Sequence, residues 1–323
     1  MSQTIYVDRK FIKLTCEKKQ LIFHTEEGQK NSLPFRLIDR LIIQGHCLID
    51  TYLLGKLSEN NITTVLFSNL RASQMAVIDS QQHNNANIHI KQYHYYQHPA
   101  LTLQAAKRLI KAKIIRQYRL IKKLQKTQPQ HRKICFDVTQ RLLSQVNHID
   151  NAQNDAQLLG MEGYAAQQYF SAFTCLFAKK LNFTHRQKRP PGDPVNAMLS
   201  LTYTIFSTRC TQALSMVGLD PYIGFYHKIS YSRQSLSMDM IEPWRPLIDQ
   251  FIYHLFKDKI ITVDMFDHKG AACLLNKKGR SLFYPAFEHE MKHWQKGINR
   301  MARFMVRELD AQITEQDIQH ESD

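Results

Sequence analysis

The chain has 323 residues, of which 43% are hydrophobic and 22% are charged, so it can bury a sizeable core and is neither disordered nor membrane-embedded. It holds 11 glycines and 10 prolines, too few for a turn-rich all-β protein of this length, which favours a largely helical chain. Lys and Arg number 43 against 28 Asp and Glu, and the net charge of +15 favours an anionic partner.

Short β-branched or aromatic runs, separated by charged turns, indicate strands in the first eighty residues. The expected strands are 4–7, 11–15, 21–24, 41–43, 63–67 and 75–79. Between the fourth and the fifth, Leu53, Leu54 and Leu57 share one face of a short helix predicted over 51–60. The stretch 81–98 is rich in Gln, His, Asn and Tyr, which predicts a linker with some helix near its end.

Beyond Pro99 the apolar residues take up a helical spacing. One apolar stripe has steps of three, four and seven and predicts a helix over 102–126 that stops before Pro129. The stripe consists of Leu103, Ala106, Ile110, Ile114, Ile121 and Leu124. Further helices are expected over 136–146, 156–180, 194–214, 244–256 and 286–309. The sequence therefore predicts an α+β multidomain fold, with a small β-rich domain over 1–86, a larger all-α domain over 87–310 and an acidic flexible tail over 311–323.

Positive charge is concentrated in the helical part. Residues 1–98 hold 11 basic and 8 acidic residues, whereas the rest of the chain holds 32 and 20. The stretch 101–133 has 11 basic residues and no acidic ones, and five basic residues share one face of the last helix: Lys292, Lys296, Arg300, Arg303 and Arg307. A solvated helix face normally mixes both signs, so each face is either a solvated surface or a contact to an anion.

The cysteines and the chain start bear on the compartment. The six cysteines are scattered and form no CxxC pair, which is typical of buried thiols in a reducing cytosol. The first ten residues are too polar for a secretory signal, and the uncharged stretch 194–208 is too short and too polar to span a bilayer. We therefore expect a soluble, cytoplasmic protein without membrane contact.

Two segments in the middle of the chain carry candidate functional residues. Glu162 lies in a helical stretch beside Gly163 and Ala165, whose small side chains let another backbone approach and enclose the carboxylate. The alternative is an ordinary exposed Glu. In the second segment, Asp193 is placed to cap the helix that Pro194 begins. Capping does not explain the basic residues that precede it, Arg186, Lys188 and Arg189.

A third segment combines a histidine with two carboxylates. His227 closes the turn 218–227, and Asp239 and Glu242 lie three residues apart, so they share one face of a helix. Pro243 follows at once and must end or kink that helix, and Arg245 comes just after it. Taken singly, such residues are more often surface or core residues than functional ones.

Together these segments resemble the CRISPR-associated protein one family, the spacer-acquisition integrases. The resemblance rests on four motifs in family-like order and spacing: Glu162-Gly-Tyr-Ala-Ala, Arg189-Pro-Pro-Gly-Asp-Pro-Val-Asn-Ala-Met-Leu-Ser, Gly224-Phe-Tyr-His and Ser235-Leu-Ser-Met-Asp-Met-Ile-Glu-Pro-Trp-Arg-Pro. The run from Leu33 to Gly45 also resembles the family's strand domain, and the likeness extends to about Leu309. His46 and Cys47 depart from it, because the family often has a small polar turn there.

The resemblance implies a metal-dependent active site. The family's ligands fall on Glu162, His227 and Glu242, with Asp239 as the alternative third ligand, and all four are candidate catalytic residues. Two carboxylates and an imidazole suit Mg²⁺ or Mn²⁺. The implied reaction is attack by a DNA 3′-hydroxyl on a phosphodiester. The candidate nucleic-acid contacts are Arg186, Lys188, Arg189, Arg245, Lys292, Lys296, Arg300 and Arg303.

The resemblance also implies partners. These are double-stranded DNA, both as spacer precursor and as repeat array, a second copy bound through the strand domain, and CRISPR-associated protein two bridging two such dimers. Two other functions remain open. One is a stand-alone metal-dependent nuclease acting on branched DNA or RNA, and the other is a basic scaffold that binds nucleic acid without chemistry.

Overall fold

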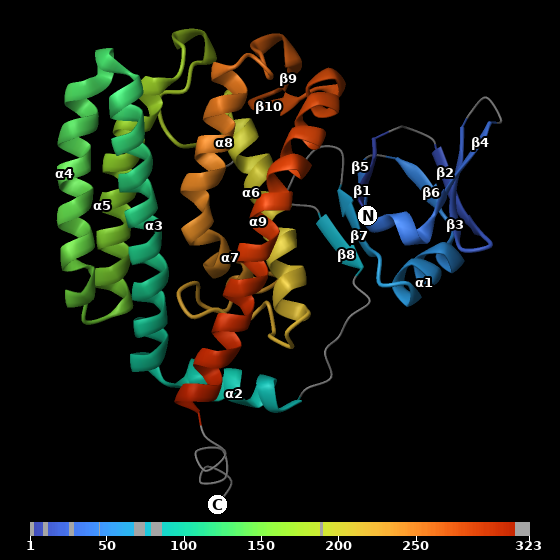
Figure 1. Cartoon of the computed structure of the whole chain (residues 1–323), viewed down its shortest axis with the longest axis horizontal. Helices are drawn as coiled ribbons and strands as arrows, with labels where there is room; N and C mark the ends of the chain where they lie inside the picture. Colours follow the sequence, from blue (N-terminus) through green and yellow to red (C-terminus); the bar gives the residue numbers. More distant parts are fainter. Residues whose placement is uncertain are drawn as a thin grey trace, which may run out of the picture. The chain divides into compact units, whose positions relative to one another are not determined.

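The computed structural model describes residues 3–8, 12–25, 29–44, 46–67, 75–78, 86–187 and 190–313. The chain divides into two compact units, and Figure 1 shows the elements of both. The N-terminal unit is Met1–Asn84 with Tyr284–Lys292, and the helical unit is Asn85–Phe283 with His293–Asp323. The predicted fold class, a β-rich region followed by a larger helical region, is confirmed.

The N-terminal unit contains two four-stranded sheets among its described residues. The first sheet has the order β1-β5-β7-β8, with strands Gln3–Val7, Ile38–Gln44, Thr63–Phe67 and Met75–Ile78. Its first three strands are parallel, and β8 runs antiparallel to β7. The second sheet has the order β4-β3-β2-β6, with strands Lys30–Pro34, Gln20–His24, Ile12–Glu17 and Cys47–Ile49. In it β6 lies parallel to β2, and the other pairs are antiparallel.

One apolar core fills the N-terminal unit. Leu14 of β2 and Leu41 of β5 are fully buried in it, together with Leu53 of helix α1 (Thr51–Glu59). Helix α1 begins where it was predicted, because the Asp50 side chain accepts a hydrogen bond from the backbone N–H of Tyr52. All the predicted strands are present among the described residues, although residues 11 and 79 lie outside the described part. Strands β4 and β6 were missed, because one is largely polar and the other has three residues.

The helical unit is built from long helices. Its α-helices are α2 (Ala86–Gln97), α3 (Pro99–Thr127), α4 (Arg132–His148), α5 (Asp155–Phe173), α6 (Pro194–Ser215), α7 (Ser235–Ile241), α8 (Arg245–Lys257) and α9 (Lys277–Gln312). Helices α3, α4 and α5 pack against one another side by side (Figure 1). Short 3₁₀ turns are Phe35–Leu37 in the N-terminal unit and Pro129–His131, Ile149–Asn151, Thr174–Leu176, Lys179–Leu181, Glu242–Trp244 and Val263–Met265 in the helical unit.

Local signals located several of these helices. Five of the six residues in the predicted stripe of α3 are buried, and the sixth, Leu103, is half-buried. At the start of α6 the Asp193 side chain accepts a hydrogen bond from the backbone N–H of Asn196, and Pro194 occupies the first turn, as predicted. Helix α7 ends at Ile241, and the chain enters the 3₁₀ turn that contains Pro243.

Tertiary contacts changed other predictions. Helix α5 was expected to reach residue 180 but ends at Phe173, because Phe177 leaves the helical path and packs edge-on against Phe173, Phe183 and Tyr253. A two-stranded antiparallel hairpin, β9 (Phe266–Lys269) and β10 (Ala272–Leu275), interrupts the region expected to be all helical. Gly270 makes its turn possible with a φ of 59°.

The last helix is longer than predicted. Helix α9 begins at Lys277, where the Asn276 side chain accepts a hydrogen bond from the backbone N–H of Gly279, and it continues through Pro285. The predicted acidic tail lies outside the described residues from position 314 onward. Within the described ranges, no helix is both long enough and apolar enough for a bilayer span.

Candidate active site

A buried lysine joins two glutamates that are distant in the sequence. The Nζ atom of Lys113 on α3 lies 2.5 Å from Oε1 of Glu162 on α5 and 2.7 Å from Oε2 of Glu242 in the 3₁₀ turn. The exposed fraction is 8% for the Lys113 side chain, 18% for Glu162 and 5% for Glu242. The two carboxylates therefore converge on one cationic centre that is largely shielded from water.

The apolar stripe of α3 places this lysine inside the protein. Lys113 lies three residues after Ile110 and directly before Ile114, both of which are fully buried. Helix α5 packs along α3 and brings Glu162 to the same level. An ammonium buried in this way needs anionic partners, and the two carboxylates supply them.

The end of α7 places Glu242. Because Pro243 cannot continue the α-helix, the chain tightens into a 3₁₀ turn in which Glu242 is the first residue. Arg116 of α3 fixes this turn, since its Nη1 donates to the carbonyl oxygen of Pro243 at 2.7 Å and its guanidinium lies 5.0 Å from the Trp244 ring centre. Helix α3 thus positions both the turn and the lysine that contacts it.

Asp239 orders the turn that carries His227. Its side chain is fully buried, and each of its oxygens accepts two hydrogen bonds. Oδ2 accepts from the backbone N–H groups of Phe225 and Tyr226 at 2.6 and 2.9 Å, and Oδ1 accepts from the backbone N–H and the Nδ1–H of His227 at 2.8 and 2.7 Å. Because Nδ1 lies against a carboxylate and donates to it, Nε2 is the nitrogen that carries the lone pair in the neutral imidazole.

A glycine lets this turn close. A Cβ atom at Gly224 would lie 2.6 Å from the carbonyl oxygen of His227 and 2.8 Å from the backbone of Ser235. Only a residue without a side chain fits between those two backbone segments. The spacing of the Gly-Phe-Tyr-His motif is therefore a geometric requirement for placing the imidazole beside α7.

Behind Glu242 lies a buried network of aromatic and charged groups. Arg245 donates from Nε to Oε1 of Glu242 at 2.7 Å, and its guanidinium lies 4.5 Å from the ring centre of Tyr203. The hydroxyl of Tyr203 donates to Asp249, and that of Tyr169 donates to the same carboxylate at 2.8 Å. This network, which spans α5, α6 and α8, limits the movement of Arg245 and hence of Glu242.

The charges in this network shift several pKa values. Burial opposes ionisation of Glu242, but Arg245 and Lys113 outweigh it and hold the pKa of this carboxyl well below its usual range. Burial likewise disfavours the Lys113 ammonium, and Glu242 and Glu162 outweigh it, so the lysine pKa is raised. Burial raises the pKa of Asp249 to about 6. Glu242 is thus a carboxylate and Lys113 an ammonium at neutral pH.

Tyr226 adds a hydroxyl beside the carboxylates. Its Oη atom is buried and has no hydrogen-bond partner within the part of the chain that the structure describes. Burial and the charges of Glu162 and Glu242 raise the pKa of this phenol, so it keeps its proton. A buried hydroxyl without a partner is costly in a folded protein, and it can donate to a ligand that enters this site.

The structure brings the predicted ligands together in two pairs. Glu162 and Glu242 meet at Lys113, and His227 pairs with Asp239, while the His227 side chain also acts electrostatically on Glu242. Among the described residues, no three His, Cys, Asp or Glu side chains form a group that could hold a metal ion. A single metal shared by Glu162, His227 and Glu242 therefore stays a prediction.

The predicted nucleic-acid contacts fall into different environments. Arg186 is half-buried, and its guanidinium donates to Oδ1 of Asn196 at 2.8 Å and to the Ser200 hydroxyl at 3.2 Å, so it braces the start of α6. Lys188 and Arg189 lie outside the described residues. Arg245 belongs to the network behind Glu242. The remaining four candidates are exposed on α9, namely Lys292, Lys296, Arg300 and Arg303.

Sequence reasoning missed Lys113, Tyr226 and Asp249. For Lys113 a signal was present, because it falls on the apolar face of α3, three residues after Ile110 and four before the buried Gln117. A charged residue within an apolar stripe indicates a buried charge that needs a partner. Tyr226 and Asp249 carry no such local signal, since their environments depend on contacts between distant segments.

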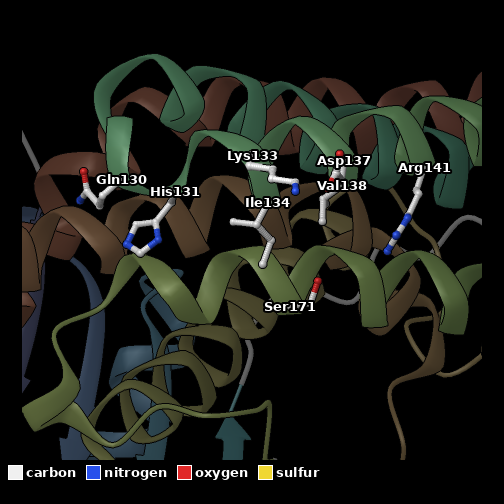
Figure 2. A pocket seen from close by; sticks show the side chains of 8 residues that line it. All are labelled: Gln130, His131, Lys133, Ile134, Asp137, Val138, Arg141 and Ser171. Carbon is white, nitrogen blue, oxygen red and sulfur yellow. The ribbon is translucent and has the colours of Figure 1, made fainter.

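A surface hollow between α4 and α5 is separate from these residues. Figure 2 shows residues that line it, among them Lys133 and Arg141 on α4 and Ser171 on α5. Its volume is about 410 Å³. None of the predicted site residues lines it, and Arg141 is already engaged with Gln168 at 2.6 Å. We therefore place the candidate active site at the Lys113 cluster and not at this hollow.

The chain is similar in sequence and in fold to known proteins. A curated relative, CRISPR-associated endonuclease Cas1 1 of Thermodesulfovibrio yellowstonii, is 33% identical over 316 residues, which are 95% of this chain and 98% of the relative. A casposase bound to integration product has a TM-score of 0.83 at 20% identity, and the match covers 98% of this chain and 93% of the casposase chain. The Cas6-RT-Cas1–Cas2 complex also gives 0.83 at 19% identity, covering 98% of this chain and 36% of the other. The family model described as CRISPR associated protein Cas1 matches residues 5–289, and the chain belongs to that family.

Proposed function

We propose that this protein is a divalent-metal-dependent DNA integrase of CRISPR adaptation, which joins 3′-hydroxyl ends of spacer DNA to a repeat array. The observation that carries the proposal is the convergence of the Glu162 and Glu242 carboxylates in a shielded site next to the oriented imidazole of His227. The name of the similar endonuclease and the integration product bound to the similar casposase support chemistry at phosphodiester bonds.

The donor atoms fit a hard divalent cation. Two carboxylates and an imidazole nitrogen with its lone pair form a mixed oxygen and nitrogen set that suits Mg²⁺ or Mn²⁺. Glu162, Glu242 and Nε2 of His227 would hold the ion. Asp239 already uses both oxygens on three backbone N–H groups and the imidazole, which favours Glu242 as the third ligand and gives Asp239 an orienting task.

When bound, the metal polarises the phosphodiester and stabilises the charge that develops on its oxygens. The groups of the protein prepare the site for this step. Arg245 and the 3₁₀ turn hold Glu242 in place, and Asp239 fixes the imidazole. The buried Tyr226 hydroxyl is available to donate to a phosphoryl oxygen, where fixed donors are most effective.

The proposed reaction is a transesterification. The 3′-oxygen of the spacer forms a bond to phosphorus, the bond from phosphorus to the 3′-oxygen of the repeat strand breaks, and the proton of the attacking hydroxyl ends on that leaving oxygen by way of solvent. No enzyme side chain becomes bonded to DNA. Hydrolysis uses the same site with water as the attacking group, and the endonuclease name of the relative favours this as the second candidate function.

The exposed basic face of α9, together with the net charge of +15, supports binding to double-stranded DNA through phosphates. The similar Cas1–Cas2 complex supports a partner of the Cas2 kind. We extend the proposal to a homodimer formed through the N-terminal unit, with two dimers bridged by that partner in the cytoplasm. Light scattering that shows a monomer at micromolar concentration contradicts the dimer.

A strand-transfer assay separates the two candidate functions. Labelled spacer DNA with 3′-hydroxyl or 3′-deoxy ends is incubated with a repeat-containing plasmid, the protein, its Cas2 partner and Mg²⁺ or Mn²⁺. An integrase attaches only the hydroxyl-ended DNA. Nicking that is equal for both ends, without attachment of label, identifies a nuclease and contradicts the integrase proposal.

A further inference from the structure

We propose that Lys113 competes with the divalent cation for the carboxylates of Glu162 and Glu242, and that the displaced ammonium then pairs with the phosphodiester of the bound DNA. This inference rests on the proposed function, because it assumes that these carboxylates bind a metal. The geometric reason is the position of Lys113 on α3, which places its ammonium between the two carboxylates.

Each carboxylate oxygen of Glu242 already accepts one hydrogen bond from a cation. Oε1 accepts from Arg245 at 2.7 Å and Oε2 accepts from Lys113 at 2.7 Å. A Mg²⁺ or Mn²⁺ ion binds its oxygen ligands at about 2.0–2.2 Å, so an ion on Glu242 meets one of these two cations at close range. A metal on this carboxylate is therefore repelled by both cations, and the repulsion falls if one of them moves away.

Lys113 is the cation that is able to leave. Arg245 has a second interaction, because its guanidinium lies on the face of Tyr203, within the network that includes Asp249. The contacts of the Lys113 ammonium, within the described part of the chain, are the two carboxylates themselves. Its four-carbon stem is flexible, whereas the planar guanidinium of Arg245 is held on two sides.

The charge balance points to the same step. Two carboxylates face two cations, so the cluster of Glu162, Glu242, Lys113 and Arg245 is neutral. A divalent ion added to this cluster produces an excess of two positive charges in a site shielded from water, which is unfavourable. Movement of the ammonium away from the carboxylates reduces that repulsion.

A displaced ammonium needs a new anion, because the Lys113 side chain is only 8% exposed. The phosphodiester that enters the metal site brings one negative charge to within reach of the side chain. Metal and DNA binding are then coupled, because the metal displaces the ammonium from the carboxylates and the DNA phosphate gives the ammonium a new partner. Lys113 thereby becomes a positioning residue for the scissile phosphate, once a metal occupies the carboxylates.

Mn²⁺ titration tests the competition, because loss of a competing lysine lowers the Kd for Mn²⁺ whereas loss of a supporting lysine raises it. The wild type, Lys113→Met and the matched control Lys111→Met are titrated with Mn²⁺ by calorimetry or by loss of the free-ion EPR signal. Lys111 lies on the same helix in an exposed ion pair with Asp150, so its removal changes the net charge equally. We expect the Kd for Mn²⁺ to fall at least tenfold in Lys113→Met and to stay within twofold in Lys111→Met.

An unchanged or higher Kd in Lys113→Met overturns the inference, because it makes the lysine a support for the metal and not its competitor. Glu242→Gln serves as the reference for site-specific binding. If the wild type binds Mn²⁺ no better than Glu242→Gln, the proposed function itself fails, and this outcome is distinct from the first.

Lysine labelling of the wild type gives a second test that requires no variant to fold. Acetylation of Lys113 is measured by mass spectrometry relative to Lys111. We expect Mn²⁺ to increase labelling of Lys113 severalfold and DNA added with Mn²⁺ to reduce it again. No increase with Mn²⁺ contradicts the displacement, and an increase that DNA does not reverse contradicts the pairing with phosphate.

Discussion

Replacing Asp239 by Asn is expected to disorganise the turn that carries His227 and to weaken metal binding. The carboxylate accepts four hydrogen bonds, two on each oxygen. An asparagine has one oxygen and one NH₂ group, so whichever way it is oriented the NH₂ faces two N–H donors. Two hydrogen bonds are lost, and the remaining two lose their charge-assisted character.

The cost follows from the burial of this side chain. Hydrogen bonds to a charged group contribute about 1.5–3 kcal/mol each, so the loss of two lowers the free energy of unfolding by about 3–6 kcal/mol. Typical proteins unfold at a cost of about 5–15 kcal/mol, so this loss is a large fraction of the free energy of unfolding. Because Asp239 fixes the imidazole, the affinity for Mn²⁺ should fall about 10–100-fold.

Urea unfolding followed by circular dichroism measures the first quantity, and Mn²⁺ titration measures the second. Asp220→Asn is the matched control, because Asp220 accepts one backbone N–H bond, from Tyr222 at 2.8 Å, which an asparagine oxygen can also accept. It should change the free energy of unfolding by less than about 0.5 kcal/mol. A loss below about 1 kcal/mol in Asp239→Asn, with unchanged Mn²⁺ affinity, refutes the reasoning about this turn.

Three further predictions address other parts of the molecule. Tyr226→Phe removes a buried hydroxyl that has no hydrogen-bond partner among the described residues, so urea unfolding should show equal or higher stability. Single-turnover strand transfer should slow about tenfold, and an unchanged rate contradicts a contact between this hydroxyl and the phosphate. Changing Lys296, Arg300 and Arg303 together to Ala should weaken DNA binding and reduce the slope of log K against log salt by about 3, and an unchanged slope means a solvated face. Burial raises the Asp249 pKa to about 6, above its unfolded value, so the folded state holds an extra proton between about pH 4 and 6 and stability falls as the pH rises through that window. Urea unfolding of Asp249→Asn should lack this pH dependence. A pH profile identical to that of the wild type contradicts this assignment.

Features with a local cause were predictable from the sequence. The cap formed by Asp193 and Pro194, the strand Thr63–Phe67 and the end of α7 before Pro243 depend on neighbouring residues, and the structure has all three. The end of α5 and the hairpin β9–β10 depend on contacts between distant segments, such as the packing of Phe177 against Tyr253. Short-range patterns do not contain that information.

In the candidate site, too, local patterns predicted some features, and contacts between distant segments determined the others. Family-like motifs indicate Glu162, His227 and Glu242 as ligands, with the neighbouring Asp239 as an alternative ligand. Only the four hydrogen bonds to Asp239 show that its oxygens are already used. Lys113 stood within a stretch of 11 basic residues and was read as part of a charged helix face. Its place on the apolar face of α3 indicates burial, but its two partners depend on the positions of α5 and the 3₁₀ turn, which no local pattern specifies.

The central claim is that Glu162, His227 and Glu242 hold the metal that makes strand transfer possible. The most direct measurement is strand transfer with Mn²⁺ by Glu162→Gln, His227→Ala and Glu242→Gln, run beside DNA binding by the same proteins and by the exposed control Asp258→Asn. We expect each site variant to lose strand transfer by at least a hundredfold while binding DNA in the absence of metal within about threefold of the wild type. The control should match the wild type in both. Strand transfer that persists near the wild-type rate in Glu162→Gln or Glu242→Gln contradicts the claim.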